Sequence, residues 1–109
     1  MSDSLPVRLK ACFAADRALY TSHARKEMRI EEFGPISEQE VCEAITSGES
    51  IEDYPDDQPY PSALILGYTR LRRPLHVVCA HSSEDDIAIV ITVYQPDPAR
   101  WVDYRRRRG

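Results

Sequence analysis

The sequence predicts an α+β fold in which N-terminal helices pack on one face of a four-stranded antiparallel sheet. Before residue 48, apolar residues recur at helical spacing, and after residue 50 they form short β-branched runs. Short turns join the last three runs, and strands joined in this way pair antiparallel. The 109 residues, 42% apolar and 29% charged, have the composition of an ordinary globular protein. Residues 1–109 are therefore interpreted as one domain.

Three amphipathic helices are predicted in the first half of the chain. Their spans are Leu5–Ala15, Ser22 to Gly34-Pro35, and Ser37 to Gly48. Apolar side chains three and four residues apart give each helix one inner face. Ser37 and Glu40 have the spacing of a capping box, which opens the third helix. Residues 17–20 are assigned to the connection between the first two helices.

Four strands are predicted in the second half: Ser50–Tyr54, Ala63–Thr69, Leu75–Ala80 and Ile87–Tyr94. The first is expected at an edge of the sheet. The sheet face away from the helices is expected to be open to solvent or to a partner. Pro96 and Pro98 end the last strand, after which a helical turn carries Trp101 toward the core. Residues 104–109 are expected to form a charged tail.

The charge is unevenly distributed along the chain. The net charge is −4, but residues 1–69 carry −7 and residues 70–109 carry +3. Twelve of the 14 basic residues are arginine, whose planar guanidinium suits phosphate recognition. A G+C-rich genome would give the same arginine bias without any function. Overall acidity argues against strong non-specific nucleic-acid binding, although it leaves room for a local basic patch.

The cysteine pattern and the apolar runs indicate the cellular compartment of the protein. Cys12, Cys42 and Cys79 are odd in number and far apart, and the chain has no C-x-x-C motif. Neither a disulfide framework nor a zinc site is therefore expected. No signal peptide is apparent, and no apolar run approaches the ~20 residues needed to cross a bilayer. These features predict a reduced, cytoplasmic protein with no cofactor, no metal and no membrane partner.

A set of polar side chains on the predicted sheet can carry chemistry. Strand alternation puts His76 on one face of its strand, and Thr92 with Tyr94 on one face of the last strand. If these faces coincide, imidazole and hydroxyl groups lie near the guanidinium groups of Arg72 and Arg73. Such a set can cleave RNA without a metal: a base deprotonates the 2′-hydroxyl, an acid protonates the leaving 5′-oxygen, and arginine holds the phosphate.

The same residues have simpler interpretations. His76 can be a buried histidine whose ring nitrogens are satisfied by the fold, and His23 can be a helix-capping residue. His81 borders a turn and is expected at the surface. The arginine run of residues 105–108 is either a solvated tail or an arm that contacts RNA.

Five motifs in order resemble the DUF4258 family over about residues 17–108. They are HA-x-x-x-M at 23–28, GE-x-IE-x-YPDD at 48–57, PS-x-L-x-LG at 61–67, RPLHVV at 73–78 and ITVY-x-PDP-x-x-W at 91–101. The resemblance implies a RelE-like or barnase-like toxin fold, many members of which are metal-independent ribonucleases. It also implies a toxin–antitoxin pair, in which the partner is a small zinc-finger protein similar to the MqsA antitoxin.

One departure from the family pattern bears on activity. Many members have an arginine just before the methionine of the first motif and another before a following glycine. Here these positions are Glu27 and Phe33. If those arginines are catalytic in relatives, this chain either uses groups on the sheet or has lost or altered the activity.

Two functions follow from these observations. In the first, a toxin-like endoribonuclease, His76 is the general base or acid, His23 a second proton carrier, and Tyr94 orients substrate or shares the proton transfer. Arg73 acts with Arg72 on the phosphate. Further substrate contacts are expected from Arg25 and Thr92. In the second, the same sheet face binds a protein partner without catalysis, which the acidic net charge and the replaced arginines favour.

Overall fold

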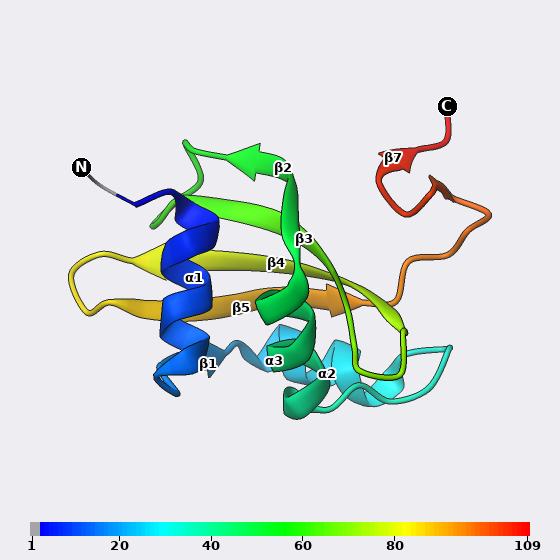
Figure 1. Cartoon of the computed structure of the whole chain (residues 1–109), viewed down its shortest axis with the longest axis horizontal. Coiled ribbons are helices and arrows are strands. Elements are labelled where there is room, and N and C mark those ends of the chain that lie inside the picture. The colour runs from blue at the N-terminus through cyan, green and yellow to red at the C-terminus, as the bar shows by residue number, and fades with distance from the viewer. Residues whose placement is uncertain (1–2) are drawn as a thin grey trace.

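A computed structural model describes residues 3–109 as three helices, a five-stranded mixed sheet and a short two-stranded hairpin (Figure 1). The sheet order is β1-β5-β4-β3-β2. The elements are α1 Leu5–Ala14, β1 Ala18–Tyr20, α2 Ser22–Ile30, α3 Glu38–Ser47, β2 Glu49–Tyr54, β3 Ser62–Tyr68, β4 Pro74–Ser82, β5 Ile87–Tyr94, β6 Trp101–Val102 and β7 Arg106–Arg107. The predicted α+β class is confirmed.

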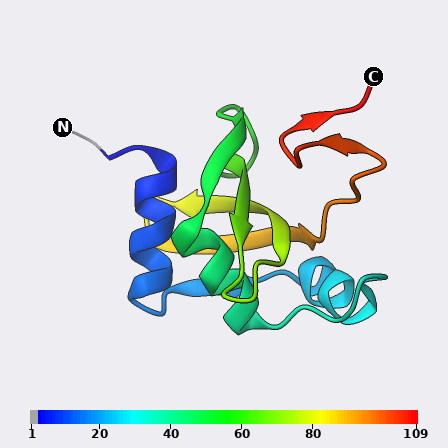
Figure 2. The ribbon, with the colours of Figure 1, turned by 45° about the vertical axis from the view of Figure 1, so that its right-hand side comes forward.

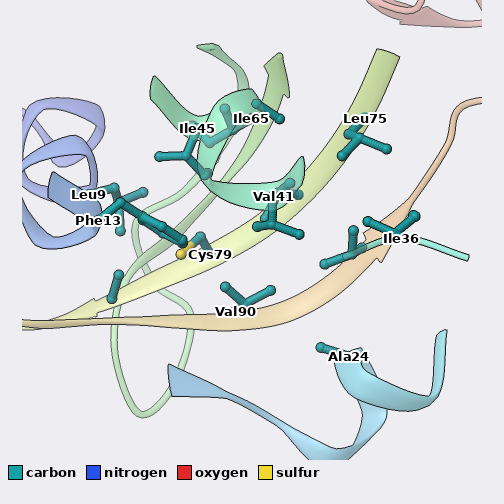
Figure 3. Close-up of a cluster of buried hydrophobic side chains, with 14 of the residues drawn as sticks. Leu9, Phe13, Ala24, Ile36, Val41, Ile45, Ile65, Leu75, Cys79 and Val90 are labelled. Carbon is teal, nitrogen blue, oxygen red and sulfur yellow. The ribbon is translucent and has the colours of Figure 1, made fainter. Parts of the chain in front are cut away.

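Helices α1 and α3 lie side by side over one face of the sheet, and α2 packs along β5 (Figures 1 and 2). Their inner faces meet alternate residues of the strands in one apolar core, as Figure 3 shows. Leu9 and Phe13 come from α1, and Val41 and Ile45 from α3. The core therefore has the two-layer arrangement expected when amphipathic helices cover one face of a sheet.

Local sequence explains where two of the helices begin. The Ser37 hydroxyl accepts the backbone N–H of Glu40, and the Glu40 carboxylate accepts the N–H of Ser37, so the predicted capping box opens α3. Helix α2 is capped by Thr21 rather than Ser22, since the Thr21 hydroxyl accepts the N–H of Ala24. It ends at Ile30, before the predicted stop at Gly34-Pro35.

A close approach between α3 and the sheet depends on Gly67 of β3. A Cβ at this position would lie 1.8 Å from the backbone oxygen of Ala44 in α3. No side chain fits there without moving the helix backbone, because real Cβ contacts are much longer. Glycine at this position therefore sets how closely α3 packs on the sheet.

The predicted four-stranded antiparallel sheet is wrong in size and in type. Strands β2 to β5 form the expected antiparallel set, with β2 at an edge. The additional strand β1 pairs in parallel with β5, Ala18 opposite Ala88 and Tyr20 opposite Val90. Three residues are too few to show a strand period, so the sequence of this segment does not indicate a strand. Its pairing is fixed by distant backbone groups of β5.

The second face of the sheet, predicted to be open, is partly covered by the C-terminal segment. Trp101 is buried against this face, where the ring contacts His76. Leu64 and Leu66, which point away from the helices, are also buried. Residues 105–108 are exposed but do not form a free tail, because the backbone of Arg106 and Arg107 pairs with β6. Among the described residues, none of the helices has the length and apolar character of a membrane span.

Candidate functional site

A groove of about 570 Å³ opens between α2 and the C-terminal segment, at the end of β5. The α2 side carries carboxylates and the C-terminal side carries guanidinium groups. The lining residues are Glu27, Ile30, Glu31, Glu32, Val93, Tyr94, Gln95, Asp97, Arg100, Trp101, Arg107 and Arg108. A cleft that combines aromatic rings with opposed charged walls is a candidate binding site.

His76 lies directly behind this groove and is fully buried. Strand register places it opposite Tyr94, and its Nδ1 lies 3.0 Å from the Tyr94 hydroxyl. Its Nε2 lies 2.6 Å from the backbone oxygen of Tyr104. Because a carbonyl oxygen can only accept, we assign the proton to Nε2, which leaves Nδ1 to accept the hydroxyl proton of Tyr94. The indole of Trp101 meets the imidazole edge-on at 4.4 Å between ring centroids.

Burial keeps both members of the His76–Tyr94 pair uncharged near neutral pH. Desolvation lowers the pKa of His76 below its ordinary value, and the hydrogen bond to the Tyr104 carbonyl opposes this shift. Desolvation raises the pKa of Tyr94 to about 12, and the positive charge of Arg107 opposes the rise. The pair is therefore a phenol that donates to a neutral imidazole, with the phenol at the groove wall.

The C-terminal hairpin is anchored to the sheet by ion pairs and stacking. The guanidinium of Arg107 lies over the Trp101 ring, 4.7 Å from its centroid, and 3.5 Å from Oε1 of Glu52. Arg105 forms an ion pair with Glu49. Both carboxylates belong to β2, so the hairpin spans from the groove to the far edge of the sheet. These contacts hold the arginine side of the groove in place.

Carboxylates from α2 close the edge of β5 that β1 leaves unpaired. Oε1 of Glu27 accepts the N–H of Val93 at 3.1 Å, and Oε2 of Glu31 accepts that of Gln95 at 3.3 Å. Glu27 thus has a structural use in this chain. An arginine could not accept this hydrogen bond.

The structure brings only some of the predicted site residues together. His76, Tyr94 and Thr92 lie on the same sheet face, as expected from alternation. His23 lies outside the groove on the exposed side of α2, with Nε2 3.4 Å from Oε1 of Glu27. Arg25 forms an ion pair with Glu38, with 2.8 Å between Nη1 and Oε2, and does not line the groove.

The two arginines predicted to hold phosphate are engaged elsewhere. Arg73 is largely buried and donates to the backbone oxygens of Gly34 and Pro35 and to the side chains of Glu40 and Gln95. Arg72 lies over the ring of Tyr68, 5.3 Å from its centroid. Neither lines the groove, so the guanidinium groups beside Tyr94 are instead those of the C-terminal segment.

The sequence did not indicate Trp101 or Arg100 as site residues, and it indicated Arg107 only as part of the arginine run 105–108. The arginine run was a signal for an arm that contacts RNA, but nothing local predicted that the arm folds back on the sheet. The turn between β6 and β7 has Asp103 and Tyr104 at φ 53° and 62°, without the Asn-Gly or Asp-Gly pair that usually indicates a hairpin.

One group of side chains among residues 3–109 has the composition and spacing to hold a metal ion. It consists of Cys12, His81 and Asp86, whose ligand atoms lie within 4.8 Å of one another. His81 lies five residues along β4 from His76, which corresponds to roughly 17 Å. The group is therefore separate from the groove.

Comparison with known proteins identifies the family. The model of a family described as a domain of unknown function, DUF4258, matches residues 20–95. This match runs from the end of β1 to the end of β5 and leaves α1 and the C-terminal hairpin outside it. No curated protein and no solved structure gives a significant match. Because the family model covers well over half of the chain, this protein belongs to the DUF4258 family.

Proposed function

We propose that this protein is a toxin-like, metal-independent endoribonuclease, related to the RelE-like toxins, that binds RNA in the groove between α2 and the C-terminal segment. The observation that carries the proposal is the hydrogen bond from the Tyr94 hydroxyl, at the groove wall, to the buried Nδ1 of His76. A hydroxyl backed by a neutral imidazole is a proton-accepting pair. Guanidinium groups on the facing segment supply the positive charge that a phosphate requires.

The proposed reaction is transesterification within RNA. The Tyr94 oxygen accepts the proton of the ribose 2′-hydroxyl while its own proton moves to Nδ1 of His76. The 2′-oxygen forms a bond to phosphorus, the bond from phosphorus to the 5′-oxygen breaks, and the leaving oxygen takes a proton from water. The imidazolium keeps its Nε2–H on the Tyr104 carbonyl and then returns the added proton to solvent through Tyr94. The products are a 2′,3′-cyclic phosphate and a 5′-hydroxyl.

Arginine side chains have the stabilising role in this scheme. Arg107 and Arg108 line the groove on the side opposite α2, with Arg100 beside them. A bidentate guanidinium neutralises the charge that builds on the phosphate oxygens in the transition state. In this scheme His76 stays buried and acts through Tyr94, so that no opening of the C-terminal segment is needed.

The direct test is cleavage of a long, mostly unstructured RNA by purified protein in excess EDTA. Wild type is expected to produce fragments with cyclic-phosphate ends. Tyr94→Phe keeps the ring and removes the hydroxyl, and should lower the cleavage rate at least ~100-fold. His23→Gln is the matched control, because His23 lies outside the groove, and should cleave like wild type. Equal cleavage by Tyr94→Phe and wild type would overturn the mechanism.

A second function, binding of a protein partner without catalysis, is favoured by one observation. Four carboxylates line the groove beside three guanidinium groups. A groove with both charges suits a polypeptide with complementary charges, such as a small zinc-finger antitoxin-like protein. This function predicts a stable complex and no RNA cleavage by the free protein, alone or with ribosomes.

Under either function, the free cysteines agree with a cytoplasmic location.

A further inference from the structure

We infer that Cys12, His81 and Asp86 form a zinc site that joins α1 to the β4–β5 hairpin. Cys12 comes from α1, whereas His81 and Asp86 lie five residues apart on the β4–β5 hairpin, and the three side chains meet at the end of the sheet away from the groove. Nε2 of His81 lies 2.9 Å from Oδ1 of Asp86, and Sγ of Cys12 lies 3.6 Å from the same oxygen. All three ligand atoms lie within 4.8 Å of one another.

These distances are close to those of a tetrahedral zinc site. Zinc binds thiolate sulfur at about 2.3 Å and imidazole nitrogen or carboxylate oxygen at about 2.0–2.2 Å, so its ligand atoms are separated by roughly 3.3–3.7 Å. The side chains therefore need to move by only about an ångström to surround an ion. In the absence of metal, the Cys12 thiol and the His81 ring N–H both donate toward Oδ1 of Asp86. Zinc binding would release the thiol proton, and His81 would ligate through Nε2 in the tautomer that carries its proton on Nδ1.

The ligand types select zinc among common divalent ions. A thiolate disfavours Mg²⁺ and Ca²⁺, which prefer oxygen ligands, whereas zinc accepts sulfur, nitrogen and oxygen together. The thiolate and the carboxylate would balance the charge of the ion. Cys12 and His81 are 2% and 5% exposed, which shields the bonds, while the Asp86 side chain is 65% exposed and leaves a path from solvent. The fourth ligand would be water.

The turn that carries Asp86 is held in position before any ion binds. Arg17 donates from Nε to the backbone oxygen of Asp86 at 2.9 Å and from Nη2 to that of Asp85 at 2.6 Å. Asp86 has a φ of 53°, and its carboxylate points toward Cys12 of α1. The positive charge of Arg17 lies nearby and opposes the binding of a cation, so the affinity for zinc depends on the thiolate and the carboxylate.

The site would have a structural role, because it cross-links the first helix to the hairpin between β4 and β5. Its position, roughly 17 Å along β4 from His76, keeps it out of the proposed RNA groove. The metal-free protein would still hold the three side chains together through hydrogen bonds. Zinc would replace these by stronger bonds and raise the thermal stability of the protein.

The test uses reduced, tag-free, full-length protein and the metals Zn²⁺ and Co²⁺. Wild type should bind one zinc per chain in competition with a chromophoric chelator. The cobalt form should show visible d–d bands of a tetrahedral site and a near-ultraviolet thiolate-to-cobalt band. Zinc at 100 times its Kd should raise the melting temperature by about 10 °C.

Three variants separate the site from other metal-binding groups. Cys12→Ala should abolish the thiolate-to-cobalt band. Asp86→Asn should weaken zinc binding at least ~10-fold, because even the loss of a residue that only hydrogen-bonds to a metal ligand has an effect of this size. Asp86→Asn keeps the fold intact, because asparagine tolerates a positive φ and the side chain is exposed. Cys42→Ser is the control, since that thiol is outside the group, and should bind zinc like wild type.

The inference would be overturned if wild type retained no zinc at micromolar concentrations, or if both Cys12→Ala and Asp86→Asn bound zinc with wild-type affinity. An octahedral cobalt spectrum without a thiolate band would also overturn it, because it would indicate adventitious binding at surface carboxylates. RNA cleavage by metal-free Asp86→Asn should equal that of metal-free wild type. The zinc inference and the proposed ribonuclease activity can therefore fail independently.

Discussion

The Tyr94 hydroxyl donates a hydrogen bond to Nδ1 of His76 across the β4–β5 pair, with 3.0 Å between the oxygen and the nitrogen. The other nitrogen of the same imidazole donates to the backbone oxygen of Tyr104, which lies between β6 and β7. One buried ring therefore connects two central strands to the C-terminal hairpin. A change in the protonation of this ring affects both the stability of the fold and the proposed chemistry of the groove.

The free energy of unfolding should decrease as the pH falls below the ordinary pKa of histidine. Burial holds the pKa of His76 below 6.5, so the unfolded chain binds a proton that the folded protein does not. Neutral His76 makes its full contribution to the free energy of unfolding above about pH 6.5. That contribution decreases as the pH falls toward the pKa of His76 in the folded protein, with a slope of at most ~1.4 kcal/mol per pH unit. Urea unfolding at a series of pH values measures this slope.

His76→Gln isolates this contribution, because glutamine can donate to the Tyr104 carbonyl and accept from Tyr94 but does not titrate. The variant should lose the part of the slope due to His76. His23→Gln, changed at an exposed histidine, should keep the wild-type profile. Identical slopes in wild type and His76→Gln would show that His76 is not the group responsible.

Gly67→Ala should destabilise the protein by at least ~2 kcal/mol, because the new methyl group would collide with the backbone of α3. The Cβ position lies 1.8 Å from the oxygen of Ala44, and a helix backbone cannot rotate away as a side chain can. The urea midpoint should fall with little change in the m-value. Gly109→Ala, where nothing lies within 4 Å of the new atom, should behave like wild type.

Arg73→Met should cost about 2 to 3 kcal/mol of stability, since Arg73 donates to two backbone carbonyls and to two side chains, including the carboxylate of Glu40. Arg72→Met should stay within about 0.5 kcal/mol of wild type, because Arg72 is exposed. Thermal melts of the two variants give the comparison. If Arg73→Met keeps wild-type stability but loses RNA binding, the earlier assignment of Arg73 to phosphate is correct instead.

Glu27→Arg should increase the affinity of the groove for single-stranded RNA. Binding should also become more salt-dependent: the slope of log affinity against log salt concentration should steepen by about 0.7 for each added phosphate contact. It should also lose about 1 to 2 kcal/mol of stability, because the N–H of Val93 loses its acceptor. Fluorescence anisotropy with labelled RNA at several salt concentrations measures the first effect.

Glu32→Arg is the matched variant, because Glu32 lines the same groove and forms none of the edge hydrogen bonds to β5. It should raise RNA affinity to a similar extent without the loss in stability. If neither variant changes RNA affinity, RNA does not bind in this groove, and the protein-partner function is favoured.

Sequence periodicity is sufficient to predict the helices and strands that pack through their own side chains. The three helices and strands β2 to β5 each contain a regular apolar pattern, and alternation alone put His76 and Tyr94 on the same face. Strand β1 has no such pattern, because its three residues are held by backbone bonds to β5, about 70 positions later in the chain.

The site could be predicted only in part for the same reason. The positions of Arg107 and Trp101 depend on a hairpin whose turn residues, Asp103 and Tyr104, are unusual at positive φ. No motif of metal ligands spaced a few residues apart could predict the group of Cys12, His81 and Asp86, because 74 positions separate its first and last members. In both cases long-range packing, and not a local pattern, determines which side chains meet.

The order of the strands has a consequence for how the chain folds as it is synthesised. The edges of the sheet, β1 and β2, come from residues 18–20 and 49–54, whereas the centre, β4 and β5, is made last. At roughly 5–20 residues per second, a ribosome needs about 2 to 9 seconds to go from the end of α3 to the end of β5. Until β4 and β5 are made, only β2 and β3 of the antiparallel strands can cover the apolar faces of α1 and α3, so we expect the nascent chain to be accessible to chaperones during that interval.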